Sequence, residues 1–280
     1  NGIAAQDAEG GALVLKFMPV SVGAPVMVIT TVIVSALFGM VFSLLLAVAA
    51  INFKADQTIT GTAMNMLATA AATVAVKAMN TAASGGNDVS SDISYTRTKD
   101  LLLVHVGGFE LNWFMLVAVL CLIAAYVALY KTRFGLRLRA CGEHPQAADS
   151  VGINVYKMRY AGVLISGFLG GVGGLAYTLA AGSGFNSDVG GYGFLALAVM
   201  IFGNWKPLPI LGASLFFALF KVIAALNATL TFLPKFEGVK EISNFYQMLP
   251  YIVTMIVLIF TSKNSQAPKA EGIPYDKGSR

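Results

Sequence analysis

The sequence predicts an all-α fold, a polytopic transmembrane helical bundle. Of the 280 residues, 56% are hydrophobic and only 12% are charged, whereas a soluble domain carries about 25% charged residues. The mean hydropathy is +0.72, and uncharged runs near the roughly 20 residues of a spanning helix recur along the chain. This composition excludes intrinsic disorder and a nucleic-acid-binding domain as descriptions of the whole chain, so we expect no nucleic-acid partner.

Uncharged runs give about seven expected spans within one transmembrane domain, residues 1–280. The first helix should begin near Pro25, and the helical part of the fourth run should end near Ala181. Lys221 interrupts the sixth run and should extend its amino group to the membrane surface. The fifth run has only 17 residues, so some spans fall short of a full crossing. The runs cover residues 20–51, 57–76, 111–130, 160–187, 189–205, 207–226 and 242–262.

The basic residues predict the orientation, because Lys and Arg are enriched on the cytoplasmic side of membrane proteins. Placing 131–159 inside puts Lys54, Lys206 and the tail 263–280 inside by alternation. That side then carries 12 of the 19 Lys and Arg residues but 5 of the 14 Asp and Glu residues. The segment 80–110 becomes an external loop, either a surface for an outside partner or a plain connector. One miscounted span would invert part of this map.

No sequence motif indicates an enzyme. The chain lacks a GxxxxGK[ST] phosphate-binding loop, a GxSxG nucleophile elbow and an HExxH zinc motif. No CxxC motif or Cys/His cluster suggests a metal site, and the two histidines are isolated, so we expect neither a metal nor another cofactor. Asp188 is the only acidic residue near the apolar core, and this scarcity argues against proton coupling. Any energy that the protein uses should therefore come from a separate subunit.

The segment 131–159 is the most informative part of the chain. Pro145 suits the first turn of a helix, where its missing N–H costs no hydrogen bond. Gly152 suits the C-terminal cap, so we expect a short helix over about 143–153. Such a helix, lying along the membrane, fits a groove in a cytoplasmic partner. From the residues alone, a solvated basic loop that satisfies the positive-inside rule is an equally good interpretation.

Three blocks resemble permeases of ABC importers, in the branched-chain amino acid, simple sugar and nucleoside superfamily. The block RFGLRLRACGEHPQAADSVGIN at 133–154 resembles their cytoplasmic coupling segment, and GGYGFLALAVMIFGNWKPL at 190–208 resembles a later signature. The block KADQTITGTAMNMLA at 54–68 is similar to the nucleoside-type members, which a lipoprotein binding component serves. Gln146 departs from the Glu of the general importer pattern. Family members carry a further hydrophobic N-terminal portion, and this chain begins with Asn, so we expect N-terminal truncation.

The resemblance implies a permease subunit of a nucleoside importer in the plasma membrane of a bacterium. Two permease subunits, a heterodimer in nucleoside-type members, form the pathway, and separate ATPase subunits hydrolyse ATP. An extracellular substrate-binding lipoprotein delivers the substrate. The residues then expected to contact the ATPase are Arg137, Arg139, Glu143, Pro145, Gln146, Ala147, Ala148 and Gly152. The two arginines either pair with acidic residues of the ATPase or bind membrane lipid headgroups.

Three other functions compete with this interpretation. Within the superfamily, the alternative is a simple-sugar permease, for example one for ribose. Outside it, the alternatives are an ion-coupled secondary transporter that works alone and a membrane scaffold without transport activity. The coupling-like segment and the scarcity of intramembrane acids argue against the last two.

Small residues in the fourth run predict close helix packing. Gly167 and Gly171, and likewise Gly170 and Gly174, have the GxxxG spacing that lets helix backbones approach within a membrane. We expect this packing within the subunit, with an interface between subunits as the alternative.

Polar residues near a break in the helices are candidates for the substrate pathway. Five glycines within 182–193 argue against a continuous helix, and non-helical backbone at membrane depth is tolerated only inside protein or beside a water-filled cavity. Asn186, Ser187 and Asp188 would then face a polar solute, although an ordinary outer loop is the alternative. Asn65 either lines the pathway or forms a hydrogen bond with another helix.

Overall fold

The chain forms two compact units that are separated at a glycine-rich stretch. A computed structural model describes residues 24–86, 90–91, 103–106, 109–181, 187, 189–226, 242–261 and 267–278. Unit 1 comprises Asn1–Val189 and Ala270–Arg280, and unit 2 comprises Gly190–Lys269. The sequence predicted one domain without this boundary. The C-terminal residues belong to unit 1 although they follow unit 2 in the chain.

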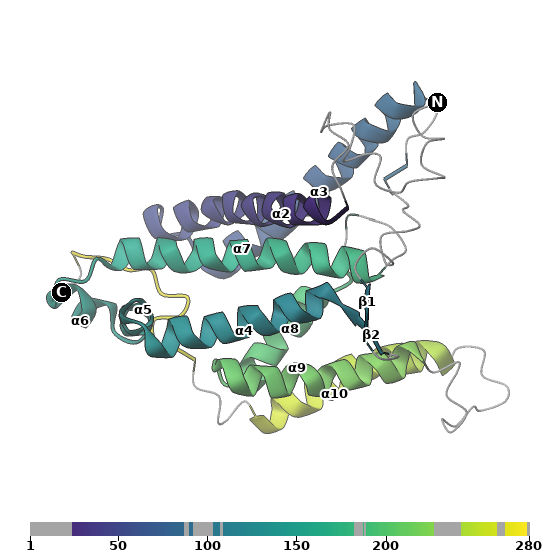
Figure 1. Ribbon diagram of the computed structural model, residues 1–280. Helices are drawn as coiled ribbons and strands as arrows, with labels where there is room; N and C mark the ends of the chain where they lie inside the picture. Colours follow the sequence, from purple (N-terminus) through teal and green to yellow (C-terminus); the bar gives the residue numbers. More distant parts are fainter. Residues whose placement is uncertain are drawn as a thin grey trace. The chain divides into compact units, whose positions relative to one another are not determined.

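The elements of each unit are mainly helices, and most coincide with the predicted runs (Figure 1). Unit 1 contains α2 (Ala24–Ala47), the π-helical turn η2 (Val48–Asn52), α3 (Gln57–Ser84), β1 (Leu103–Val106), β2 (Phe109–Asn112), α4 (Trp113–Lys131), α5 (Arg133–Glu143), α6 (Pro145–Ser150) and α7 (Val155–Ala181). Unit 2 contains α8 (Tyr192–Phe202), α9 (Pro207–Ala225) and α10 (Ile242–Thr261).

The predicted polytopic helical fold is confirmed, and each of the seven predicted runs overlaps a helix of the described residues. Within the described ranges, 5 helical stretches are long and apolar enough to cross a membrane. They are Ile29–Asn52, Gln57–Ala82, Trp113–Lys131, Val155–Thr178 and Pro207–Ala225. Helix α8 has 11 residues and is too short, because such a helix rises about 16 Å against a hydrocarbon core of about 30 Å. Helix α10, with 20 residues, covers the last predicted run.

Small residues bring α2 and α7 of unit 1 into close backbone contact (Figure 1). A Cβ atom at Gly167 would collide with Ser43 and with the carbonyl oxygen of Gly39. A Cβ atom at Gly171 would collide with the carbonyl oxygen of Ser35, whose hydroxyl donates a 2.8 Å hydrogen bond to the carbonyl oxygen of Gly171. Lipid gives two apolar helices little hydrophobic reason to associate, so close packing of this kind stabilises the pair.

The second glycine pair of α7 differs from the first. A Cβ atom at Gly170 or Gly174 would meet no atom of the described residues within 4 Å. Of the two GxxxG pairs, one therefore packs against α2 and the other has open space. The contact face of α2 has the same four-residue spacing of small residues, at Ser35, Gly39 and Ser43. This spacing is easily missed because the rest of α2 is so apolar.

The segment predicted as an external loop contains regular structure near both ends. Helix α3 continues to Ser84, where Gly85 caps it in the left-handed conformation at φ 65°. Strands β1 and β2 pair antiparallel with Leu103 opposite Asn112, so the fold is not strictly all-α. The sequence signal for this hairpin is a pair of short strand-like stretches separated by the glycines at 107–108.

A small apolar core holds the three helices of unit 2 together. Val199 of α8 and two side chains of α9, Ala213 and Phe217, are buried in it. Val253 and Val257 of α10 pack against them. Each helix contributes one apolar face to this core, while many apolar side chains elsewhere on α8 and α9 stay exposed. That exposure is expected of helices that contact lipid or other membrane helices.

Candidate functional site

Helix α5 begins at a sharp corner after α4. The Thr132 hydroxyl donates a 2.5 Å hydrogen bond to the Ala128 carbonyl oxygen and accepts a 3.1 Å hydrogen bond from the Gly135 backbone N–H. One side chain therefore closes α4 and caps α5. A Cβ atom at Gly135 would collide with the Ala128 carbonyl oxygen, so only glycine permits this corner.

Helix α5 occupies a stretch for which the sequence reasoning gave no separate helix. Phe134, Leu138 and Cys141 lie on one face, four and three residues apart, as on an amphipathic helix. The three arginines lie outside this face, together with the exposed Leu136, and made the stretch resemble a basic loop. The Arg139 guanidinium lies 4.6 Å from the centroid of the Tyr130 ring, a cation–π contact that joins α5 to the end of α4.

Helix α6 is the short helix predicted in this segment, and it is shorter than expected. Pro145 occupies its first turn, as predicted. His144 has φ −141° and ψ 82°, which separates α6 from α5, because the residue before a proline avoids the helical conformation. Gly152 has φ 82°, and its N–H donates a 2.9 Å hydrogen bond to the Asp149 carbonyl oxygen. The helix therefore ends at Ser150 rather than at 153.

A small apolar core fixes α6 and the end of α5 to α7. Cys141 and Ala148 are 3% exposed, Val155 is 1% exposed, and all three pack with Tyr275 from the C-terminal tail. Burial raises the pKa of the Cys141 thiol, and the positive charge of Arg159 opposes this effect. The α5–α6 corner is therefore held as part of a packed body rather than as a solvated loop.

The exposed side chains on α6 and directly beside it are a mixture of small, polar and apolar ones. Pro145 and Ala148 are buried and serve to anchor the helix. The predicted contact residues that are exposed or partly exposed are Arg137, Arg139, Glu143, Gln146, Ala147 and Gly152. Beside them Val151 is 74% exposed, a residue that the sequence reasoning did not select. One helical turn therefore offers an uncharged contact surface bordered by charged side chains.

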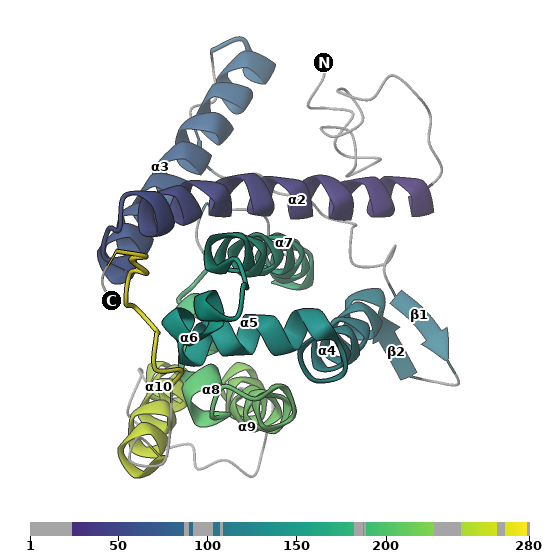
Figure 2. The ribbon, with the colours of Figure 1, turned by 90° about the vertical axis from the view of Figure 1, so that its left-hand side faces the viewer.

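The C-terminal tail, residues 270–278, packs on the same region of unit 1 (Figure 2). The Ala270 backbone N–H donates a 2.9 Å hydrogen bond to the Gly142 carbonyl oxygen at the end of α5. The Arg159 guanidinium of α7 donates a 3.0 Å hydrogen bond to the Ile273 carbonyl oxygen. Sequence reasoning placed this segment inside the cell but gave no signal that it packs on α5 and α7.

Tyr275 anchors the tail to α7. Its side chain is 4% exposed, and the Tyr156 ring meets it edge-on with the centroids 5.3 Å apart. The Arg159 guanidinium lies 5.9 Å from the centroid of the Tyr275 ring. One aromatic side chain of the tail therefore contacts the apolar core, a second aromatic ring and a cation.

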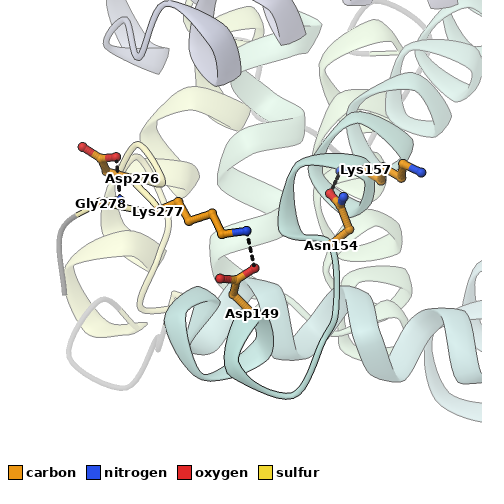
Figure 3. Close-up of polar contacts among 6 residues, drawn as sticks. All are labelled: Asp149, Asn154, Lys157, Asp276, Lys277 and Gly278. Atoms are coloured by element: carbon orange, nitrogen blue, oxygen red, sulfur yellow. Dashed lines mark hydrogen bonds and ion pairs between the residues drawn. The ribbon is translucent and has the colours of Figure 1, made fainter.

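Two ion pairs connect the tail to other segments of unit 1. Lys54 Nζ lies 2.8 Å from Asp276 Oδ2, and Lys277 Nζ lies 4.0 Å from Asp149 Oδ1 on α6 (Figure 3). The hydrogen bond with Asp276 raises the pKa of Lys54. The same bond, together with the Gly278 backbone N–H, lowers the pKa of Asp276. Both partners of the first pair are therefore charged at neutral pH.

The turn at 52–56, the segment 131–159 and the tail meet in unit 1 (Figure 2). The Tyr160 hydroxyl adds a 3.0 Å hydrogen bond to Asn52 Oδ1. These are three of the segments that the distribution of basic residues placed on one side of the membrane. Their contacts are compatible with that orientation.

The described residues include two of the four predicted pathway residues. Asn65 lies on an exposed face of α3. Ser187 has φ 60°, and its hydroxyl oxygen is buried without a hydrogen-bond partner among the described residues. Asn186 and Asp188 lie outside the described residues.

Lys221 of unit 2 lies between two aromatic rings. Its Nζ lies 4.5 Å from the centroid of the Tyr192 ring and 5.3 Å from that of the Tyr251 ring. The three residues come from α8, α9 and α10, so no spacing along the chain signals the cluster. Aromatic faces attract an ammonium group. The two rings therefore offer the Lys221 ammonium a favourable site besides the membrane surface.

Among the described residues, no three His, Cys, Asp or Glu side chains gather into a metal-binding group.

A family comparison decides the class of protein. The family model described as Branched-chain amino acid transport system / permease component matches residues 3–261. The chain belongs to this family. The match crosses both structural units, so one family domain includes the helices of each. The permease is therefore a membrane transport component and not an enzyme.

Individual relatives extend the comparison. The permease is 41% identical over 255 residues to the nucleoside ABC transporter permease protein NupC of Lactococcus lactis, covering 88% of this chain and 77% of the relative. It is 41% identical over 248 residues to the guanosine ABC transporter permease protein NupQ of Bacillus subtilis, covering 86% and 76%. A second Lactococcus lactis protein, the nucleoside ABC transporter permease NupB, is 30% identical over 113 residues, covering 39% and 30%. No solved structure matches the chain significantly.

Proposed function

We propose that the permease is the membrane subunit of a bacterial ATP-driven importer of nucleosides. The observation that carries this proposal is the 41% identity to NupC and to NupQ over most of both chains. NupC is named for nucleosides and NupQ for guanosine. Identity of this extent, spread over both structural units, supports a shared substrate class. ATP hydrolysis belongs to separate ATPase subunits.

In this proposal α6 is the contact surface for an ATPase subunit. The outer residues Gln146 and Ala147 of α6, and Val151 directly after it, are uncharged, which suits insertion into a groove. Its inner residues Pro145 and Ala148 are anchored in the core that α6 shares with α7. A short helix held in this way moves together with a membrane helix when a partner pushes on it. Arg137, Arg139 and Glu143 border the surface and pair with charges at the rim of the groove.

A second permease subunit completes the pathway in this proposal. NupB and NupC come from one organism and are both similar to this chain, which supports a pair of related, non-identical permeases. An extracellular lipoprotein delivers the nucleoside, and the complex resides in the plasma membrane. Asn65, Asn186, Ser187 and Asp188 line the pathway. The buried Ser187 hydroxyl, which lacks a partner among the described residues, supports a polar ligand at that position.

The test is uptake of radiolabelled guanosine by cells with and without this permease. Deletion should abolish saturable uptake at low substrate concentration, and the wild-type gene should restore it. Uptake of radiolabelled ribose in the same cells provides the matched control. Loss of ribose uptake with guanosine uptake intact would replace the nucleoside assignment with a simple-sugar one.

A further inference from the structure

The C-terminal tail is docked through specific contacts rather than lying loosely on the surface. Residues 270–278 form no helix or strand, and a terminal segment of this kind stays mobile unless contacts offset its conformational entropy. Here Tyr275 is as buried as the core residues. Backbone groups of Ala270 and Ile273 also form hydrogen bonds with α5 and α7. Apolar, aromatic and polar contacts therefore fix one short segment.

Two adjacent residues of the tail contact two different parts of unit 1. Asp276 pairs with Lys54, which lies between η2 and α3. Lys277 pairs with Asp149, which lies on α6 (Figure 3). The tail therefore forms a direct bridge from α6 to the turn that joins α2 to α3. It also continues the chain from α10, so it connects the last helix of unit 2 covalently to this bridge.

The turn at Lys54 is held in an unusual conformation. Lys54 has φ 53°, a region that residues other than glycine seldom adopt and that persists only where the surroundings fix it. The Asp56 side chain caps α3 by accepting hydrogen bonds from the Thr58 and Ile59 backbone N–H groups at 2.8 and 3.0 Å. A turn held by the Asp56 cap and by the Lys54–Asp276 pair should pass a displacement of Asp276 to α3.

We propose that the C-terminal tail is a positioning element that transmits movement of α6 to the α2–α3 turn during the ATPase cycle. This inference rests on the proposed function, in which an ATPase subunit moves α6. Without the tail, α6 remains anchored to α7, which still contacts Asn52, but it loses its direct bridge to the α2–α3 turn. ATP hydrolysis then continues while fewer substrate molecules cross the membrane for each ATP consumed.

Cys141 gives a measure of tail docking that does not depend on transport. The thiol is buried in the apolar core that includes Tyr275, so departure of the tail should expose it to a maleimide. In a Cys121→Ser background, Tyr275→Ala and truncation after Lys269 should accelerate labelling about tenfold, because local opening is no longer required. Tyr275→Phe keeps the ring and should label as slowly as the parent protein.

The decisive readout is the number of guanosine molecules imported per ATP hydrolysed by the complete complex in proteoliposomes. In Tyr275→Ala and the truncated protein this ratio should fall about fivefold, the lower end of typical coupling effects. ATPase binding should stay unchanged, and Tyr275→Phe should keep the parent ratio. An unchanged ratio in a protein whose Cys141 labels rapidly would overturn the transmission role alone. A parent complex that imports no nucleoside would overturn the proposed function as well.

Exchanging the charges of Lys54 and Asp276 provides a second test in case Tyr275→Ala does not fold. Lys54 and Asp276 are both partly exposed, and Asp is among the residues that tolerate positive φ. Lys54→Asp alone should lower the import ratio, and adding Asp276→Lys should restore at least half of the loss. Equal ratios in the single and the exchanged variant would contradict the bridge.

Discussion

Lys54 Nζ and Asp276 Oδ2 lie 2.8 Å apart, joining the turn after the first span to the end of the chain. Asp276 also accepts a 3.1 Å hydrogen bond from the Gly278 backbone N–H, whereas its contact with Lys54 joins two segments that lie far apart in the sequence. Together with the Lys277–Asp149 pair, the contact gathers charged residues from the turn, α6 and the tail. These are segments that the positive-inside rule places in the cytoplasm.

The Lys54–Asp276 pair should be insensitive to pH across the neutral range. The pKa of Asp276 is lowered, so its stabilisation is present above the ordinary Asp pKa of about 4 and is lost as the pH falls through the lowered value. The pKa of Lys54 is raised, so its stabilisation is present below about 10.4 and is lost as the pH rises through the raised value. A nitroxide at Gly278→Cys, in a protein without other reactive cysteines, should stay immobile between these limits. A mobility change centred near neutral pH would contradict the pairing, and Asp276→Asn should remove the acidic step.

The two glycine pairs of α7 should respond to alanine in opposite directions. Gly167→Ala and Gly171→Ala force α2 away from α7 and should destabilise the protein by about 1–3 kcal/mol. Gly170→Ala and Gly174→Ala meet open space and should be neutral or stabilising by up to about 1 kcal/mol, because alanine favours the helix. Thermal unfolding in detergent measures both pairs. Equal destabilisation by all four substitutions would show that the second pair is also packed.

The outer surface of α6 should tolerate small side chains and reject bulky ones. Ala147→Glu and Ala147→Arg should each weaken ATPase binding by at least about tenfold, equivalent to about 1.4 kcal/mol, because either side chain blocks entry into a groove. Ala147→Ser provides the matched small control and should bind normally. Co-purification and equilibrium binding of the ATPase subunit measure the effect. Retention of binding by both charged variants would exclude α6 as the contact.

The aromatic rings around Lys221 should contribute more to stability when the lysine is present. Tyr192→Leu removes the ring whose centroid lies 4.5 Å from Nζ and should lower the melting temperature. In a Lys221→Met background the same substitution should cost less, with a coupling of about 0.5–2 kcal/mol. Thermal unfolding of the four proteins in this cycle gives the coupling directly. A coupling of zero would show that the rings only pack against neighbouring helices.

Local signals made several elements predictable. Long uncharged runs located α2, α3, α4, α7, α9 and α10, and Pro145 with Gly152 bracketed α6. Helix α5 was missed, although Thr132 and the spacing of Phe134, Leu138 and Cys141 indicate it, because its arginines resemble those of a basic loop. The hairpin β1–β2 was missed because the segment 80–110 was interpreted as a loop from its polar, Gly/Ser-rich start.

Contacts between distant segments could not be predicted from one sequence. The burial of Tyr275 depends on Cys141, Ala148 and Val155, which lie on the three helices α5, α6 and α7. The partners of Lys221 likewise come from two other helices. Whether Gly167 or Gly170 packs against α2 depends on how α7 is rotated about its own axis. Spacing alone leaves that rotation undetermined.

The most direct test of the central claim is import by the complete complex in proteoliposomes. Vesicles that hold the permease, its partner permease, the ATPase subunits and the binding lipoprotein should accumulate guanosine only when ATP is supplied on the ATPase side. Excess unlabelled nucleosides should compete, and excess ribose should not. Accumulation that persists in vesicles without ATPase subunits, driven by an ion gradient, would contradict the account.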